Sequence, residues 1–269
     1  MRNSTRGLVG AAAAMLLLVG SGANGAEPAA APSPAARAPK TLKILTPDQV
    51  NPARLLAPPP EDGSAAQRLD LSEVQRAYRE RSPERYAQAK WDDTHESPEL
   101  FAATLGPAFD LAKLPETAKL LALVDNEQSV SANIAKRYFL RNRPWAIDTS
   151  IVACDYKPGA NSKTSYPSGH ATLGYSVGGV LAELIPERAQ AILARATDYA
   201  YSREVCGAHY PSDVEASHVL GSAIALQMLA NPKVMPMVSA ARAELRAAGL
   251  TAAPRVGDAA SPASPARGR

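Results

Sequence analysis

The first of three segments suited to binding an oxyanion contains Lys136 and, seven residues later, Arg143 followed by Pro144. On a helix this spacing puts both cations on one face, about 10 Å apart along the axis. The face between them is apolar, and unpaired cations there are costly unless an anion lies between them. Pro144 disfavours helical geometry at Arg143, so we expect the helix to end there and that side chain to turn inward. Alternatively, this is a solvated basic helix end, with Arg137 and Arg141 nearby.

The second segment, residues 167–170, reads Pro-Ser-Gly-His and precedes a helical pattern over residues 172–185. Ser168 suits a helix cap, and Gly169 allows the backbone to approach a ligand closely. Free amides at a helix start, with the dipole behind them, can bind an anion. His170 would then stand beside the bound anion. The alternative is an ordinary cap followed by a surface histidine.

The third segment begins with Arg203, which lies four, seven and eleven residues after Tyr199, Ala196 and Ile192. This spacing continues the buried stripe of a helix rather than its wet face. A buried arginine needs a partner, which is either a carboxylate or a bound phosphate.

The same segment continues to His209, Pro211 and Asp213. Pro211 fits only the first turn of a helix, so His209 should lie just before that helix and Asp213 in its opening turns. Asp213 can then accept from one nitrogen of the His209 ring and leave the other free as a nucleophile. The alternative is a purely structural His–Asp hydrogen bond.

Taken together, three cations, a glycine amide site and two histidines are what transfer of a dianionic phosphoryl group requires. Guanidinium groups match phosphate oxygens bidentately, one histidine attacks, and the other donates a proton to the leaving alkoxide. Acids and histidines do not cluster at metal-ligand spacing in the sequence, so we expect the cations to supply the charge stabilisation without a metal or another cofactor.

The elements that position these residues are predicted to be helices that begin at prolines. Ser82 and Pro83 form a cap and a first turn, and Pro115 and Pro186 are each followed by glutamate. No run shows convincing strand alternation. Aromatic residues are scarce at 5%, which also favours helices over a β-sandwich. The sequence therefore predicts an all-α, single-domain helical bundle with the active site at helix ends.

The two ends of the sequence differ in character from its middle. Residues 1–26 have the order of a secretory signal peptide, with two arginines, an apolar stretch and then small residues; the alternative is a buried N-terminal helix. Residues 27–40 are an Ala/Pro-rich linker and residues 251–269 a disordered tail, which leaves 41–250 as one domain. No later run reaches the roughly 18 apolar residues of a spanning helix, so we expect a soluble periplasmic or secreted protein without a membrane span.

Net charge and cysteine content bear on nucleic-acid binding and on the pairing of the two cysteines. The formal net charge of +3 gives no argument for a nucleic-acid-binding surface. In an oxidising compartment Cys154 and Cys206 are expected to pair, although two separate buried thiols are the alternative. These cysteines lie too far apart in sequence to suggest a structural zinc site.

The order Lys-x6-Arg-Pro, Pro-Ser-Gly-His and Ser-Arg-x5-His-x3-Asp resembles the signature of the phosphatidic-acid-phosphatase and vanadium-haloperoxidase superfamily. All three blocks match, in order. Residues 55–66 (LLAPPPEDGSAA), 165–166 and 205–208 also look like the bacterial class A non-specific acid phosphatases. The resemblance covers nearly the whole span 41–250.

This resemblance implies a role for each matching residue. His209 would form a phosphohistidine, Asp213 would position it, and His170 would be the general acid. The phosphate would be cradled by Lys136, Arg143, Ser168, Gly169 and Arg203. Cys154 and Cys206 fall where the family's paired cysteines lie. Pro211 departs from the polar residue of the family and puts the approach to His209 in doubt.

Family members are all-α, exported and active without metal on many small phosphomonoesters, and they are often homodimers. The resemblance therefore implies an acid phosphatase of broad specificity. The alternatives are a vanadate-dependent haloperoxidase, a lipid phosphate phosphatase and a non-catalytic anion-binding module.

The remaining acids and histidines match no block. Asp92, Asp93 and Glu127 are interpreted as structural or surface groups, and His218 as peripheral to the pocket.

Overall fold

The computed structural model describes residues 40–252, and every regular element within them is helical. The helices are α1 (Pro52–Leu55), α2 (Ala65–Glu80), α3 (Pro83–Thr94), α4 (Ala102–Leu105), α5 (Pro115–Phe139), α6 (Pro144–Ile147), α7 (Gly169–Leu184), α8 (Ala189–Val205), α9 (Pro211–Leu229) and α10 (Met235–Ala247), with short 3-10 helices η1 (Pro98–Phe101) and η2 (Pro186–Arg188). The expected all-α class is confirmed. The expected signal peptide, nearly all of the linker and residues 253–269 of the tail lie outside the described residues.

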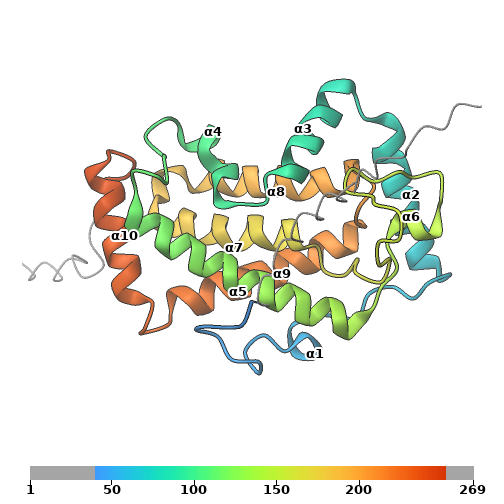
Figure 1. Ribbon diagram of the computed structural model, residues 1–269, viewed down its shortest axis with the longest axis horizontal. Helices are drawn as coiled ribbons and strands as arrows, with labels where there is room; N and C mark the ends of the chain where they lie inside the picture. Colours follow the sequence, from blue (N-terminus) through green and yellow to red (C-terminus); the bar gives the residue numbers. More distant parts are fainter. Residues whose placement is uncertain (1–39, 253–269) are drawn as a thin grey trace, which may run out of the picture. The chain divides into compact units, whose positions relative to one another are not determined.

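Helix α7 is the centre of the bundle and packs against α5, α8 and α9 (Figure 1). Its apolar side chains, among them Leu173, Val177 and Leu181, are fully buried. A helix that is apolar all round is stable only when other elements enclose it. The first turn of α7 therefore lies among neighbouring helix ends, where the predicted active-site segments are found.

Glycines let the neighbours of α7 approach its backbone. A Cβ atom on Gly178 would lie 3.1 Å from Cζ of Phe101 and 3.3 Å from Cβ of Ala196, which is on α8. On the side facing α9, a Cβ atom on Gly179 would lie 2.9 Å from Cβ of Ala225. Any larger residue at these positions would push the helices apart, because protein interiors have few voids to absorb the added volume.

Prolines begin the helices where the sequence placed them. Ser82 Oγ accepts from the amide of Arg85 at 3.2 Å, and Pro83 is the first residue of α3. Pro115 begins α5, and Pro186 begins the 3-10 turn that leads into α8. The fixed φ of proline suits a first turn, where its missing N–H leaves no acceptor unsatisfied.

The predicted end of the helix that carries Lys136 is wrong. Helix α5 ends at Phe139, and Leu140 adopts a left-handed conformation with φ 51°. Arg143 lies beyond this turn in extended backbone, with φ −75° and ψ 157°. Lys136 and Arg143 therefore do not share a helix face, although the chain reversal still brings both into the same site.

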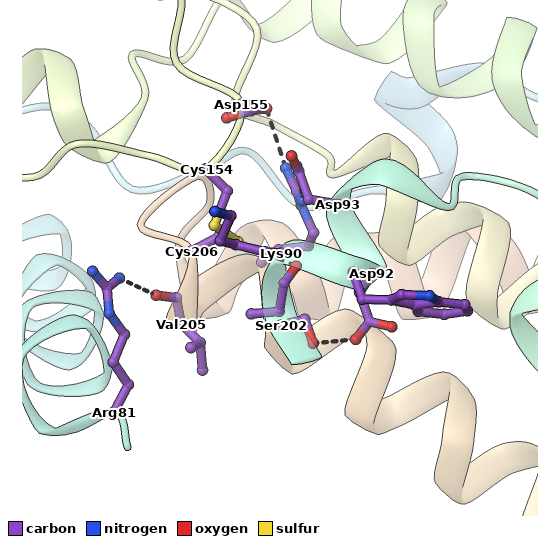
Figure 2. Close-up of a disulfide and its surroundings, with 12 residues drawn as sticks. Arg81, Lys90, Asp92, Asp93, Cys154, Asp155, Ser202, Val205 and Cys206 are labelled. Carbon is purple, nitrogen blue, oxygen red and sulfur yellow. Dashed lines mark hydrogen bonds and ion pairs between the residues drawn. A yellow bond between two sulfur atoms is a disulfide. The ribbon is translucent and has the colours of Figure 1, made fainter. Parts of the chain in front are cut away.

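Two of the carboxylates interpreted as structural do hold elements together. Asp92 is fully buried and accepts a hydrogen bond from Ser202 of α8 (Figure 2). It also accepts one from Arg195 of the same helix, and the two bonds fasten α3 to α8. Glu127, on α5, is also fully buried and accepts from the amides of Lys43 and Leu45 at 2.8 and 2.9 Å. Asp92 is thus paired with a cation and Glu127 is hydrogen-bonded to amides, which offsets the cost of burying each carboxylate.

Cys154 and Cys206 form the expected disulfide, with Cα atoms 5.2 Å apart (Figure 2). The amide of Cys154 also donates to the carbonyl of Cys206 at 3.2 Å. The bond joins the end of α8 to residues 148–165, a segment without a long helix that includes Asp155.

Replacing both cysteines by serine should lower the free energy of unfolding. A cross-link across 52 residues stabilises by about 4 kcal/mol when it restricts the unfolded chain. Urea unfolding of the Cys154→Ser/Cys206→Ser double variant should therefore show a lower midpoint than oxidised wild type. Adding a reductant should move the midpoint of wild type and leave that of the variant unchanged. Equal midpoints for the oxidised proteins would contradict the prediction.

Candidate active site

The three predicted segments meet where helix ends converge. Lys136 lies in the last turn of α5, His170 in the first turn of α7, Arg203 in the last turn of α8 and Asp213 in the first turn of α9. Burial and then the positive charge of Arg203 lower the pKa of His170, and the charges of His209 and Lys136 lower it further. The side chains that the sequence singled out therefore share one electrostatic site.

His209 is 1% exposed, and its Nδ1 lies 3.3 Å from Oδ2 of Asp213. Because an ionised carboxylate only accepts, this contact assigns a proton to Nδ1 and leaves the lone pair on Nε2. Burial, followed by the charges of Arg143 and Arg203, lowers the pKa of His209 well below its ordinary value and favours the neutral ring. Pro211 is the first residue of α9, so the predicted placement of His209 just ahead of that helix is confirmed.

The carboxylate of Asp213 is fully buried and held on both oxygens. Arg141 Nη1 donates to Oδ1 at 2.6 Å. Ser165 Oγ and the amide of Tyr210 donate to Oδ2 at 2.5 and 2.9 Å. With its orientation determined by these donors, Asp213 in turn orients the ring of His209.

Arg141 is a site residue that sequence reasoning missed. Its side chain is 2% exposed and bridges Asp213 to Asp70, with 2.7 Å between Nη2 and Oδ2 of Asp70. Its guanidinium also lies 4.0 Å from the ring centre of Tyr210. Burial opposes the charge of Arg141, but Asp213 and Asp70 outweigh it and raise the pKa of the guanidinium. The interpretation of Arg141 as part of a solvated helix end is wrong, because the left-handed turn at Leu140 directs the chain inward.

Arg203 is completely buried, as its place in the helical stripe predicted. Nη1 lies 2.5 Å from Oδ1 of Asp93, and Nη2 lies 3.1 Å from Oδ2 of Asp155. Nε is buried and has no hydrogen-bond partner among residues 40–252. A buried unpaired donor costs about 1–3 kcal/mol, so this atom is suited to an acceptor from a ligand. Of the two kinds of partner predicted for Arg203, the structure shows carboxylates, those of Asp93 and Asp155. Its Nε remains as a donor for a ligand.

Arg143 reaches the same place from the segment after α5. Its Nη1 donates to the carbonyl of Ala208 at 3.2 Å and lies 3.4 Å from Oδ2 of Asp155. Oδ2 of Asp155 therefore lies between the guanidinium groups of Arg143 and Arg203. Burial alone would raise the pKa of Asp155, but Arg203 and Arg143 outweigh it and lower the pKa. Its side chain is 33% exposed, so this anion lies at the mouth of the site.

Lys136 supplies the third cation. Burial and then the charge of Arg143 lower its pKa to about 8. A Cβ atom on residue 169 would lie 3.5 Å from Nζ, so glycine at this position leaves space beside the ammonium group. No hydrogen bond or ion pair of Nζ occurs within the described part of the chain, and this cation is thus available to a ligand.

Ser168 caps α7, as predicted. Its Oγ accepts from the amide of Ala171 at 3.3 Å, and its own amide donates to Oγ of Ser217 at 2.9 Å. The amides of Gly169 and His170 belong to the first turn and have no acceptor within the helix. Because Nζ of Lys136 lies near Gly169, these amides, the helix dipole and the ammonium group together make the first turn of α7 suited to an oxyanion.

His170 is held by the backbone of α3. Its Nε2 lies 3.0 Å from the carbonyl of Asp93, and its Nδ1 lies 3.5 Å from Oε1 of Glu96. The prediction that Asp93 is only a structural or surface group is wrong, because this residue contacts both His170 and Arg203. Its partners follow it by 77 and 110 residues, so the local pattern of the sequence carried no signal of these contacts.

In residues 40–252, no three His, Cys, Asp or Glu side chains gather in a way that would hold a metal ion. Over the same residues, no helix combines the length and apolar character needed to cross a bilayer. His218, interpreted as peripheral, is half-exposed and packs against the ring of Tyr175.

Comparison with known proteins identifies relatives of this chain. A profile of the PAP2 superfamily matches residues 120–233, which include all three predicted blocks. An acid phosphatase of Zymomonas mobilis is 38% identical over 177 residues, covering 64% of this chain and 67% of the relative. A non-specific acid phosphatase of Providencia stuartii is 31% identical over 201 residues, covering 71% and 79%. Another from Salmonella typhimurium is 29% identical over 203 residues, covering 74% and 81%.

The motifs, the helical fold and these relatives agree with one another. The chain belongs to the PAP2 superfamily, among the class A non-specific acid phosphatases.

Proposed function

We propose that this chain is an exported acid phosphatase that hydrolyses phosphomonoesters of broad specificity through a phosphohistidine on His209, without a metal. The observation that carries the proposal is the arrangement of donors around the two histidines. The buried Nε of Arg203, the ammonium group of Lys136 and the amide of Gly169 have no partner among residues 40–252. The names of the relatives, all acid phosphatases, support the same reaction.

In this proposal the cations bind the phosphate and offset its charge. Arg143 and Arg203 present guanidinium groups, which can bind phosphate oxygens bidentately. Lys136, Gly169 and Ser168 complete the cradle. Charge stabilisation by such fixed groups is stronger in a partly buried site than in water, and it can replace the electrostatic contribution of a metal ion.

Phosphoryl transfer begins with attack on phosphorus by Nε2 of His209. A P–N bond forms while the ester P–O bond breaks, and the leaving oxygen takes the proton of protonated His170. Asp213 accepts the Nδ1 hydrogen bond of His209 and stabilises the positive charge that the ring acquires. Water then attacks the phosphorus, and neutral His170 takes a proton from that water. The P–N bond breaks, its electron pair returns to Nε2 of His209, and inorganic phosphate leaves.

The reaction needs His209 neutral and His170 protonated in the same complex. Burial and the neighbouring cations lower the pKa of both rings in the free protein, which favours neutral His209 and opposes protonated His170. A bound dianionic phosphate counters the charges of the cations and so raises the pKa of His170. Activity should therefore be highest at acidic pH and fall on both sides.

Export is proposed from two features. Residues 1–26 have the pattern of a signal peptide, and disulfides persist mainly in oxidising compartments. The haloperoxidase and lipid phosphatase alternatives gain no support from the relatives, whose names specify neither activity.

Replacing His209 by alanine should abolish turnover of an aryl phosphate. Loss of the nucleophile should lower kcat by at least roughly 1,000-fold, since the remaining groups only bind and polarise the phosphate. Phosphate release is measured with excess chelator present, and wild type should retain its activity there. His218→Ala is the matched control, because His218 is half-exposed and should leave kcat unchanged. Full activity of the His209 variant, or loss of wild-type activity in chelator, would contradict the mechanism or its metal independence, respectively.

Arg141→Ala should weaken both the fold and the reaction. Removing the partner of a fully buried carboxylate costs about 3–5 kcal/mol, and kcat should fall because Asp213 no longer has a fixed orientation. Thermal unfolding and phosphate release measure the two effects. Arg137→Ala, an exposed position on α5, should change neither. A variant as stable and active as wild type would show that Asp213 does not depend on Arg141.

Asp155→Asn should strengthen inhibition by inorganic phosphate. Oδ2 of Asp155 lies between Arg143 and Arg203, two of the residues proposed to bind phosphate, and competes with the bound anion for them. Removing this charge should lower the inhibition constant of phosphate by roughly three- to tenfold. Asp148→Asn, in the same segment but hydrogen-bonded to Gln75, removes an equal charge and should have little effect. An unchanged inhibition constant for the Asp155 variant would mean that phosphate does not meet this carboxylate.

A further inference from the structure

The contacts of His170 determine which of its nitrogens can gain and lose a proton. Nε2 lies 3.0 Å from the carbonyl oxygen of Asp93. A carbonyl oxygen can only accept, so Nε2 carries a hydrogen in both the neutral and the protonated ring. The proton that His170 gains and loses is therefore the one on Nδ1, and Nδ1 faces Oε1 of Glu96 at 3.5 Å.

Apart from Glu96, the charged and titratable groups around His170 give little support to a positive charge. The groups that face it are Asp93 from α3, Lys136 from α5, Tyr199 and Arg203 from α8, and His209 ahead of α9. Three of these are basic, Tyr199 is neutral, and the carboxylate of Asp93 is engaged by Arg203. Within the described residues, Glu96 is the one carboxylate that forms an ion pair with the His170 ring.

Glu96 itself lies in a segment whose backbone is held in place. The preceding residue, His95, stacks on Trp91 with ring centres 3.9 Å apart, and its carbonyl accepts from the hydroxyl of Tyr199 at 3.1 Å. The amide of Leu100 donates to the carbonyl of Ser97 at 3.1 Å on the other side. The Glu96 side chain is 49% exposed, so it lies at the surface beside the buried ring of His170.

The charges that act on Glu96 come mainly from the site. Burial raises the pKa of Glu96, and Lys136 and Arg203 oppose that shift. Asp125 raises it slightly and Lys40 lowers it, and these two residues pair with each other at 3.2 Å. Glu96 is thus a carboxylate placed between the proposed general acid and the cations of the phosphate cradle.

We propose that Glu96 is a positioning residue for the general acid: its carboxylate stabilises the proton on Nδ1 of His170 until the leaving oxygen of the ester takes it. The proposal rests on the proposed phosphatase reaction. The proton passes from Nδ1 to the leaving oxygen as the P–O bond breaks, so His170 becomes neutral and Glu96 keeps its charge throughout. In the hydrolysis of the phosphohistidine, Nδ1 takes a proton from the attacking water and the ion pair forms again.

This role makes the effect of Glu96 depend on the leaving group. An alkoxide needs a proton as it departs, whereas nitrophenolate leaves readily without one. Glu96→Gln should therefore lower kcat for an alkyl phosphate such as glycerol 2-phosphate at least about tenfold more than for p-nitrophenyl phosphate. Loss of the negative charge also makes His170 lose its proton at lower pH. The alkaline limb of the pH profile should accordingly move about one pH unit toward acid.

The test compares wild type with Glu96→Gln, Glu96→Asp and Glu99→Gln on both substrates across pH. Glu96→Asp keeps the charge and should retain an alkaline limb closer to that of wild type. Glu99→Gln removes an exposed carboxylate three residues away and should behave like wild type. Because each substrate ionises identically in all assays, a shift between proteins reports a group of the enzyme. Thermal midpoints equal to that of wild type would exclude misfolding as the cause.

Each result has a definite meaning. A Glu96→Gln profile that coincides with that of wild type, or an equal loss on both substrates, would overturn the role of Glu96. A wild-type protein without phosphatase activity, or an active His209→Ala variant, would instead overturn the proposed function. The two failures are therefore distinguishable in the same set of assays.

Discussion

Burial of three cations that repel one another is the constraint on which this site depends. Lys136, Arg143 and Arg203 lie close enough to disfavour one another's positive charge, and partial burial deprives them of the water that would relieve it. At an effective dielectric constant near 20, two unit charges 4 Å apart interact by about 4 kcal/mol. A dianionic phosphate relieves this repulsion, and a site held in this state by the fold needs little reorganisation to bind it.

Carboxylates around the site offset the repulsion among its cations. Asp93 forms an ion pair with Nη1 of Arg203, and Asp155 lies between Arg203 and Arg143. Arg141 has a different function, since it pairs with Asp213 and thereby fixes the ring of His209. One set of ion pairs therefore balances the charges of the cations, and another orients the ring of His209. Both depend on helix ends that converge around the first turn of α7.

The parts of this arrangement that were predictable from the sequence are those with a local cause. The buried stripe of α8 predicted a buried Arg203, and Pro211 predicted that His209 precedes a helix and that Asp213 lies in its first turns. Ser168 as a cap and the proline-led helices follow from the same kind of short-range rule.

The features that could not be predicted depend on contacts between distant segments. Arg141 meets Asp70 and Asp213 across 71 and 72 residues, and Arg203 meets Asp93 across 110. No periodicity encodes such a pairing. Arg143 was identified as a site residue for a wrong reason, because the left-handed turn at Leu140 ends α5 before the supposed shared face is complete.

The glycine contacts of α7 also bear on how such an enzyme can diversify. Where helices meet with no side chain between them, almost any substitution alters their spacing, and this spacing sets the separation of His170 from Arg203 and His209. The interface between these helices therefore tolerates few substitutions. Residues 156–161, by contrast, are exposed and can accept insertions and new side chains. Selection can therefore change which esters are admitted while the apparatus that cleaves them stays intact.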